Sequence, residues 1–288
     1  MISLQQINQQ YVKAIPIPDE DRRPIKGYDV CEEVYANIFL CAKKKSGKTS
    51  ALFKIMKECC VKKTIIYIFC STAYKDKNWI QIRKYFKNKG MDLHVFTSIF
   101  EDGQDQLANL IEDLKQEAKD EEEAKEQQFC EISDEDRCDD ILARLGSTPS
   151  QEIEEEKQKK PKKSKYLAPE YMIIFDDLSS ELKSRSLLSL LKFNRHFKSK
   201  LIISSQWLHD LLPESRKQID LFLIFRGFPI KKLAEIYKDC DSGIPFETFL
   251  KLYQKATQHK HSFLYVDSRS DSFRRNFDSE FIIHDQEF

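Results

Sequence analysis

A short polar segment lies between an apolar run and an amphipathic stretch: Lys43-Lys44-Lys45-Ser46-Gly47-Lys48-Thr49-Ser50. The run before it is Asn37–Cys41, and the stretch after it repeats apolar residues at helical spacing. In a strand, loop and helix of this order, backbone N–H groups and the helix N-terminus form a nest for phosphate oxygens. We therefore predict a nucleotide-binding loop over these eight residues, with Lys48 on the terminal phosphates and the Thr49 hydroxyl on Mg²⁺.

The loop departs from the usual pattern at its first position, where Ala42 stands in place of glycine. Alanine fits there if its φ is negative, whereas Gly47 is needed for close backbone approach. The alternative interpretation is a solvated lysine-rich turn or a localisation signal at Lys43–Lys45. The flanking strand and helix favour the phosphate-binding loop.

A second candidate group follows the apolar run Tyr171–Phe175, which ends in Asp176 and Asp177. A strand that ends in acids beside a phosphate-binding loop supplies what phosphoryl transfer requires. We assign Asp176 to the metal and Asp177 to polarising a water molecule. The alternative is a capping acid, because Asp177-Leu178-Ser179-Ser180 also resembles a helix start.

Two further polar residues stand beside predicted strands. Gln206 ends the run Leu201–Ser205, where its amide could sense a γ-phosphate, orient water or simply bond the strand end. Arg216 precedes the run Leu221–Phe225, a position from which an arginine can complete a neighbouring subunit's site. An exposed, salt-bridging role for Arg216 is equally open.

The remaining pattern alternates strands and helices. Apolar, β-branched and aromatic runs predict strands at 64–70, 93–96 and 262–266, with one possible short strand at Tyr28–Val30. Helical spacing predicts helices at 77–89, 182–191, 233–237 and 246–253. Because buried strands that alternate with helices are typical of parallel sheets, we predict an α/β fold with a doubly wound, mostly parallel central sheet flanked by helices.

The 288 residues suit one large α/β domain, or one domain plus an appendage. We predict an N-terminal leader at 1–35 and a domain at 36–288 that is interrupted at about 117–165 by a charged, flexible insertion. Residues 112–157 hold 18 acidic and 6 basic side chains, which leaves 41 basic against 29 acidic in the rest. A basic body of this kind suits a polyanion-binding protein.

Composition excludes several classes of protein. The eight cysteines are scattered without a CxxC motif, which argues against a zinc site or a disulfide framework and for free, partly buried thiols. No apolar run approaches the roughly 20 residues that span a bilayer, so we expect a soluble intracellular protein without membrane contact. His259 and His261 lack a third nearby ligand, so we interpret them as surface histidines.

Taken in order, these residues resemble the viral genome-packaging ATPases of the FtsK/HerA superfamily, in the poxvirus-type branch also found in virophages and Polinton-like viruses. The resemblance covers nearly the whole chain apart from the insertion and the extreme N-terminus. The motifs that carry it are Lys26-Gly27-Tyr28-Asp29, Lys44–Thr49, Ile173–Leu178, Arg195-His196, Ile203–Gln206, Arg216 and Tyr265-Val266-Asp267.

The resemblance implies a P-loop NTPase with a RecA/FtsK-HerA-like sheet that uses ATP and Mg²⁺. Asp176 would be the metal carboxylate, Asp177 the catalytic carboxylate and Gln206 the sensor, with Arg195 or Arg216 as the arginine finger. It also implies a homo-oligomeric ring, a hexamer, that threads double-stranded DNA into a capsid without reading its sequence. Capsid proteins would be partners at the host-cell site of virus assembly, with association with the virion also open. Asp177 stands where related motors often carry the longer Glu.

Two other functions remain open at this stage. A non-hydrolysing nucleotide-binding scaffold between capsid or replication proteins is favoured by Ala42, and opposed by the joint presence of Lys48, Thr49, Asp176, Asp177 and Gln206. A helicase-like P-loop NTPase would separate the strands of a forked duplex, which a packaging motor need not do. A small-molecule kinase should carry an arginine-rich lid, and the sequence has none.

Overall fold

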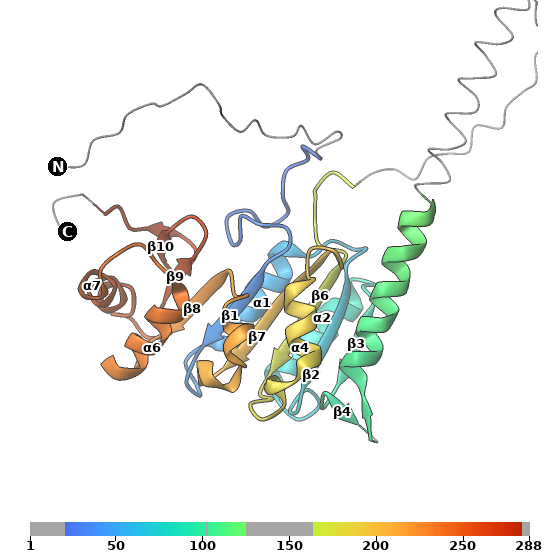
Figure 1. Ribbon diagram of the computed structural model, residues 1–288, viewed down its shortest axis with the longest axis horizontal. Helices are drawn as coiled ribbons and strands as arrows, with labels where there is room; N and C mark the ends of the chain where they lie inside the picture. Colours follow the sequence, from blue (N-terminus) through green and yellow to red (C-terminus); the bar gives the residue numbers. More distant parts are fainter. Residues whose placement is uncertain (1–20, 102, 125–163, 284–288) are drawn as a thin grey trace, which may run out of the picture.

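Continuous apolar strands form the centre of the fold, as the sequence predicts. The computed structural model describes residues 21–101, 103–124 and 164–283. Its main sheet has nine strands (Figure 1), in the order β11 (Ser279–Glu280), β10 (Ser272–Arg275), β9 (Phe263–Asp267), β8 (Leu221–Phe225), β1 (Asn37–Cys41), β7 (Ser199–Ser205), β6 (Tyr171–Asp176), β2 (Ile65–Cys70) and β3 (Leu93–Phe96). From β8 to β3 the neighbours are parallel, while β9, β10 and β11 extend the sheet antiparallel. The predicted α/β class with a mostly parallel sheet is confirmed.

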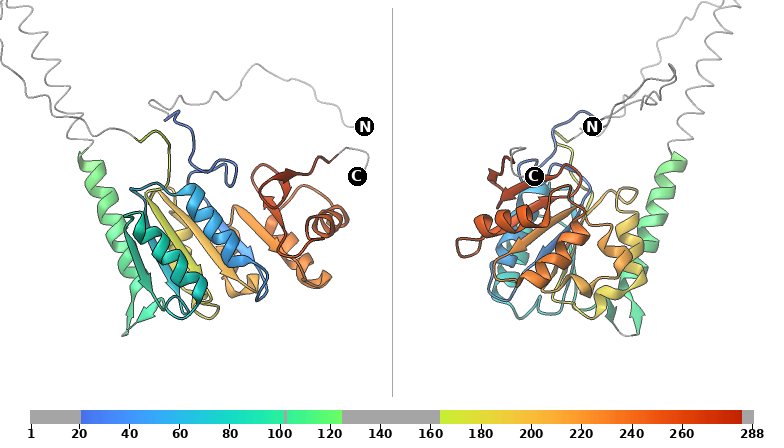
Figure 2. Two further views of the ribbon diagram at one scale, coloured as in Figure 1. Left: turned by 180° about the vertical axis from the view of Figure 1, so that it is seen from behind. Right: turned by 60° about the vertical axis from the view of Figure 1, so that its left-hand side comes forward.

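Helices cover both faces of this sheet. Successive residues of β1 point to opposite faces, so Ile38 and Leu40 pack with α1 (Lys48–Cys59) and α2 (Lys77–Asn88). Phe39 faces the other core, to which α4 (Arg185–Lys192), α6 (Ile230–Cys240), α7 (Phe246–Ala256) and the helix at 106–124 contribute. The view from behind in Figure 2 shows α1 and α2 on their shared face.

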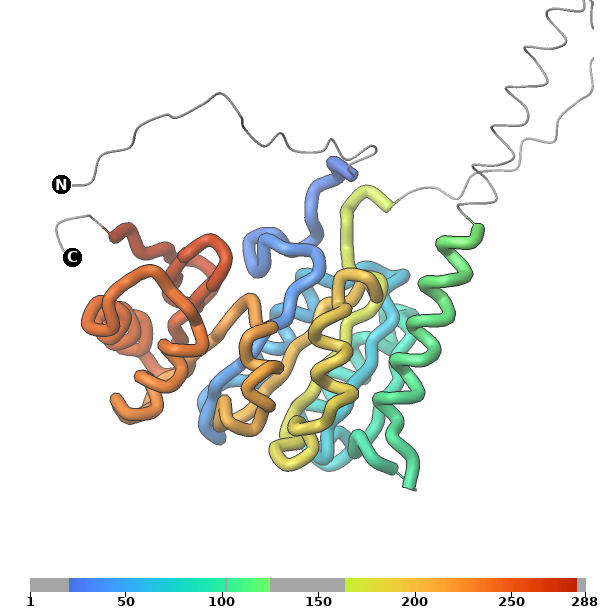
Figure 3. Tube along the Cα trace, viewed as in Figure 1, coloured from blue at the N-terminus to red at the C-terminus, as the bar shows by residue number. Residues whose placement is uncertain are grey.

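Strand register brings the candidate residues to one edge of the sheet. Cys41, the last residue of β1, pairs with Ser205, the last of β7, and Asp176 of β6 pairs with Ser204. The blue β1 in Figure 3 thus lies beside the yellow-to-orange β7, which separates it from β6. The residues that directly follow β1, β7 and β6 therefore lie close together at the same edge of the sheet.

Shorter elements complete the described chain. They are the two-stranded ribbon of β4 (Phe100–Glu101) and β5 (Gln104–Asp105), the 3₁₀ turns η1 (Glu181–Lys183) and η2 (Leu208–Asp210), and α5 (Pro213–Arg216). The helix expected at 182–191 is split into η1 and α4 because the Ser184 side chain caps α4 by accepting from the N–H of Leu187. The other expected strands and helices agree with the observed ones apart from their ends.

The charged insertion falls largely outside the described residues. Its first part, up to residue 124, continues the helix that begins at 106, and residues 125–163 and 1–20 are not described. Six cysteines lie in the described part of the chain, and all are free and buried. None of the helices described there is long and apolar enough to cross a membrane.

The expected strand at Tyr28–Val30 is wrong, because residues 26–30 form a turn. Gly27 takes a left-handed φ of 78°, and its carbonyl accepts hydrogen bonds from the N–H groups of Val30 and Cys31. A Cβ on Gly27 would come within 2.8 Å of the Cys59 Sγ and 2.9 Å of the Glu58 backbone. Only glycine allows the leader to lie this close to the end of α1.

We expect Gly27→Ala to lower the free energy of unfolding more than Gly90→Ala does. Both glycines have positive φ, 78° and 65°, but a Cβ on Gly90 would meet only the Lys62 side chain at 3.8 Å. The difference should be about 1–3 kcal/mol, the usual cost of overpacking, and urea unfolding of both variants measures it. Equal losses would mean that the leader moves away from α1 without cost.

Candidate functional site

The predicted phosphate-binding loop joins β1 to α1 at the carboxyl edge of the sheet. The N–H of Ala42 donates to the Ser205 carbonyl at 3.0 Å, which ties the loop to the end of β7. Ala42 is fully buried among the apolar residues under α1 and does not take a positive φ, so alanine is accommodated there as expected. The Ser46 hydroxyl is buried and has no hydrogen-bond partner among the described residues.

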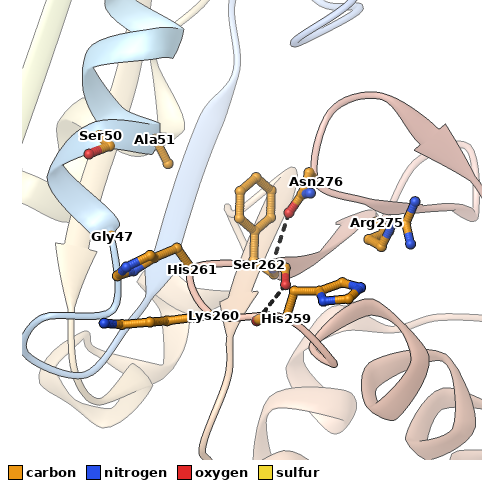
Figure 4. A pocket seen from close by; sticks show the side chains of 10 residues that line it. Gly47, Ser50, Ala51, His259, Lys260, His261, Ser262, Arg275 and Asn276 are labelled. Carbon is orange, nitrogen blue, oxygen red and sulfur yellow. Dashed lines mark hydrogen bonds between the residues drawn. The ribbon is translucent and has the colours of Figure 1, made fainter.

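Gly47 makes the turn from the loop into α1. Its φ of 99° is left-handed, and its carbonyl accepts from the N–H groups of Ser50 and Ala51. A Cβ at this position would lie 3.1 Å from the Cβ of His261, which comes from the loop before β9 (Figure 4). Glycine is therefore required both by the backbone conformation and by the neighbouring loop.

Two carboxylates hold the Lys48 ammonium at the end of β6. Its Nζ lies 2.8 Å from Asp176 Oδ1 and 3.3 Å from Asp177 Oδ1. Burial disfavours the charged form of Lys48, but the attraction and hydrogen bonds of Asp176 and Asp177 outweigh it, so the pKa of Lys48 is raised. The lysine stays charged at neutral pH, and the sequence-predicted Lys48, Asp176 and Asp177 lie together.

Asp177 has an unusual backbone conformation. Its φ of 60° is left-handed, which aspartate tolerates better than most residues. The Ser71 hydroxyl donates to its carbonyl at 3.0 Å and holds the turn beside the end of β2. The turn leaves the Asp177 side chain about two-fifths exposed, whereas the Asp176 side chain is buried. Of the two acids, Asp177 is therefore the one that water can reach.

The sequence interpretation missed Trp79. Trp79 lies in the helix expected at 77–89; its indole Nε1–H donates to Asp176 Oδ2 at 2.9 Å, and both side chains are buried. With Oδ2 bound to Trp79, only Oδ1 faces the Lys48 ammonium. A signal was present, because a buried tryptophan N–H usually finds an acceptor, but the sequence does not say which one.

Gln206 lies where the sequence predicts it, directly after β7 and thus between the loop and the two aspartates. The ammonium of Lys232 lies 3.3 Å from the ring centroid of Trp207, the residue after Gln206. The three loop lysines before Ser46 are exposed, and the ammonium of Lys43 lies 5.7 Å from the Phe228 ring centroid. The carboxyl edge is thus lined with cations near the loop.

The two candidate arginines lie elsewhere. Arg195 is exposed on the turn before β7, a seven-residue strand that spans roughly 20 Å from that turn to Gln206. Arg216 donates to the Leu211 carbonyl at 3.2 Å and pairs with Asp239 at 3.7 Å. Among the described residues, no hydrogen bond or ion pair links either guanidinium to the loop or to the aspartates.

Thr49 and Asp176 fit the chemistry of a magnesium site. The described residues contain no group of three or more His, Cys, Asp or Glu side chains that could hold a metal by itself. Mg²⁺ in phosphate-transfer sites usually takes one or two protein oxygens and completes its shell with phosphates and water. Asp176 Oδ1 already carries a cation, the Lys48 ammonium, and this shows that its position suits positive charge. His259 and His261 are both exposed.

No family model and no curated protein matches the chain. Among solved structures, the genome packaging NTPase B204 from Sulfolobus turreted icosahedral virus 2 in complex with AMP is 16% identical, with a TM-score of 0.50 over 88% of this chain and 100% of that one. Its complex with AMPPCP is 17% identical, with a TM-score of 0.49 over 84% and 97% of the two chains. B204, the DNA-packaging ATPase from Sulfolobus turreted icosahedral virus, is 18% identical, with a TM-score of 0.46 over 86% and 98%.

The first of these comparisons covers 88% of this chain. It shows that the chain shares the fold of a genome packaging NTPase from end to end of that protein. The fold that the resemblance implies is thus confirmed.

We expect Trp79→Phe and Asp176→Ala to be coupled in stability. Hydrogen bonds to charged groups contribute about 1.5–3 kcal/mol, so a double-mutant cycle should give a coupling energy in that range. Urea unfolding of the two single variants and the double variant measures it. Additive losses would show that the 2.9 Å contact does not hold Asp176 in place.

Proposed function

We propose that this chain is an ATPase that drives double-stranded DNA into a viral capsid, as a hexameric ring at the host-cell site of virus assembly. One observation carries the proposal. The Lys48 ammonium contacts both Asp176 and Asp177 at the edge of the sheet where β1, β7 and β6 end. The fold shared with a genome packaging NTPase supports it.

ATP binding would exchange the partners of Lys48. The ammonium would leave Asp176 and bind the β- and γ-phosphates, while the loop N–H groups and the first turn of α1 hold the remaining phosphate oxygens. The Ser46 hydroxyl, which is buried without a partner among the described residues, gains an acceptor when a phosphate enters the loop. Lys43, Lys44, Lys45 and Ser50 add charge and hydrogen bonds around the nucleotide.

Hydrolysis depends on the groups that meet at the strand ends. Thr49 and Asp176 would hold Mg²⁺, which offsets the charge that develops on the transferred phosphate. Asp177, the more exposed acid, accepts a proton from the attacking water and orients it. Gln206, at the end of the strand between β1 and β6, donates to the γ-phosphate or to that water.

In a ring, a neighbouring subunit would supply an arginine to the nucleotide. Among the described residues, neither Arg195 nor Arg216 contacts Lys48, Asp176 or Asp177, so in this proposal each would act on a neighbouring subunit's nucleotide. Arg195 is exposed and free to do so, whereas Arg216 must first leave Leu211 and Asp239. Hydrolysis would then depend on how two subunits meet.

The DNA contact would be electrostatic. Outside residues 112–157 the chain has 41 basic against 29 acidic side chains, which suits contacts to phosphates without reading bases. Capsid proteins would be the second class of partner.

Lys48→Ala should weaken ATP binding by about 10- to 100-fold, because it removes a charge-assisted hydrogen bond to phosphate. Isothermal titration of MgATP measures the affinity. Lys54→Ala is the matched control, since Lys54 lies on the same helix and, within the described part of the chain, its ammonium pairs only with Glu58 on the surface. Equal affinity of both variants for ATP would remove the phosphate-binding assignment.

Asp177→Asn should bind ATP normally but hydrolyse it about 100-fold more slowly or worse, because the group that accepts the proton is lost. Steady-state phosphate release measures turnover. Asp241→Asn is the control, because Asp241 shares the left-handed φ but caps α6. Normal turnover in Asp177→Asn would assign the water to another residue, and no turnover in the unsubstituted chain would favour the non-hydrolysing scaffold.

A further inference from the structure

Two hollows flank the first turn of α1, and Ser50 lines both. The first, which we call the β9 pocket, has a volume of about 610 Å³ and lies between α1, the loop before β9 and the end of β10 (Figure 4). Its walls include Gly47, Ala51, His261, Phe263 and Asn276. The second, the α2 pocket, has about 340 Å³ and lies between α1 and α2, where Thr49, Phe53, Gln81 and Tyr85 line it.

A nucleotide held by the loop must send its base and ribose to one of these hollows. The terminal phosphate is expected beside Asp176 and Asp177, which lie two strands from β1 on the side of β2. The α2 pocket is on that same side: α2 gives Trp79 to Asp176, and the metal-binding candidate Thr49 lines the pocket. The β9 pocket is on the opposite side of β1, next to β8 and β9.

We infer that the β9 pocket binds the nucleoside end of the nucleotide, and that the α2 pocket does not. A phosphate chain that runs along the N-terminus of α1, with its terminal group at the aspartates, points its other end at the β9 pocket. This inference rests on the proposed ATP binding at Lys48. The volume lies within the range of small-ligand pockets, roughly 300–1,000 Å³, and is ample for a base and a ribose.

The chemistry of the walls suits a planar, heteroaromatic base. Asn276 is fixed by Phe263, since its N–H donates to the Phe263 carbonyl at 3.0 Å and its Oδ1 accepts from the Phe263 N–H at 3.2 Å. Its Nδ2 amide makes no hydrogen bond to any residue that the structure describes, so it can donate to a ring nitrogen of the base. The ring of His261, on the other wall, offers a surface for stacking.

The loop that carries His261 is held in a strained shape. His261 has a left-handed φ of 68°, which is uncommon for residues other than glycine. The Ser262 hydroxyl donates to the His259 carbonyl at 2.6 Å and closes this turn. The strain places the imidazole beside Gly47, at the junction between the phosphate-binding loop and the β9 pocket.

Binding of MgATP and of magnesium tripolyphosphate to the full chain separates the two ends of the nucleotide. We expect Asn276→Gly to weaken ATP binding about fivefold, the effect of one hydrogen bond, with no change for tripolyphosphate, which has no nucleoside. Glycine suits the positive φ of Asn276, 56°. Gln81→Ala, in the α2 pocket, is the control that should change neither affinity.

Equal effects of Asn276→Gly on both ligands, or an effect of Gln81→Ala on ATP alone, would overturn the inference. Photolabelling of the unsubstituted chain with 8-azido-ATP needs no variant, and the label should fall on residues 259–263 or 275–277. Label on residues 78–85 would instead place the base in the α2 pocket. If neither ligand binds in a Lys48-dependent manner, the proposed function itself falls.

Discussion

The ion pair between Lys48 and Asp176 is the interaction on which the site depends. Asp176 is buried, and a buried carboxylate is costly unless charge and hydrogen bonds compensate it. Trp79 binds one of its oxygens and Lys48 the other, so the pair ties α2, β6 and the phosphate-binding loop together. In the proposed function, a phosphate would replace Asp176 as the partner of Lys48, and another cation would take the place of Lys48 beside Asp176. In that exchange the buried Asp176 carboxylate would keep a cation beside it both with and without the nucleotide.

The sequence predicts most of the candidate residues at the carboxyl edge of the sheet, because the patterns that place them lie in neighbouring residues of the chain. Apolar runs predict the strands, and the residues directly after Cys41, Phe175 and Ser205 are therefore expected at one edge of a parallel sheet. Contacts between distant segments cannot be predicted in this way. The helical spacing of apolar residues predicts that Trp79 is buried, but it does not predict that Asp176 accepts its hydrogen bond. The sequence predicts a short strand where residues 26–30 form a turn, because the close packing of Gly27 against α1 depends on residues far away in the sequence.

The antiparallel end of the sheet extends this same site. β9 runs back along β8, so the loop before it returns to the carboxyl edge beside Gly47, and β10 brings Asn276 to the same place. His259 and His261, which the sequence suggests are ordinary surface residues, thus line a pocket next to the phosphate-binding loop. In the proposed function, residues from the parallel and the antiparallel parts of the sheet would approach one nucleotide, and the two arginines would act on a neighbouring subunit.

In the proposed function, ATP hydrolysis at this site moves double-stranded DNA. The direct measurement is ATP-dependent displacement of a third strand from a triplex by the full chain, with Asp177→Asn as the blank and a forked duplex in parallel. A motor of this kind should displace the third strand, leave the forked duplex paired and lose activity as salt rises. Hydrolysis without displacement, or separation of the forked strands, would contradict the account.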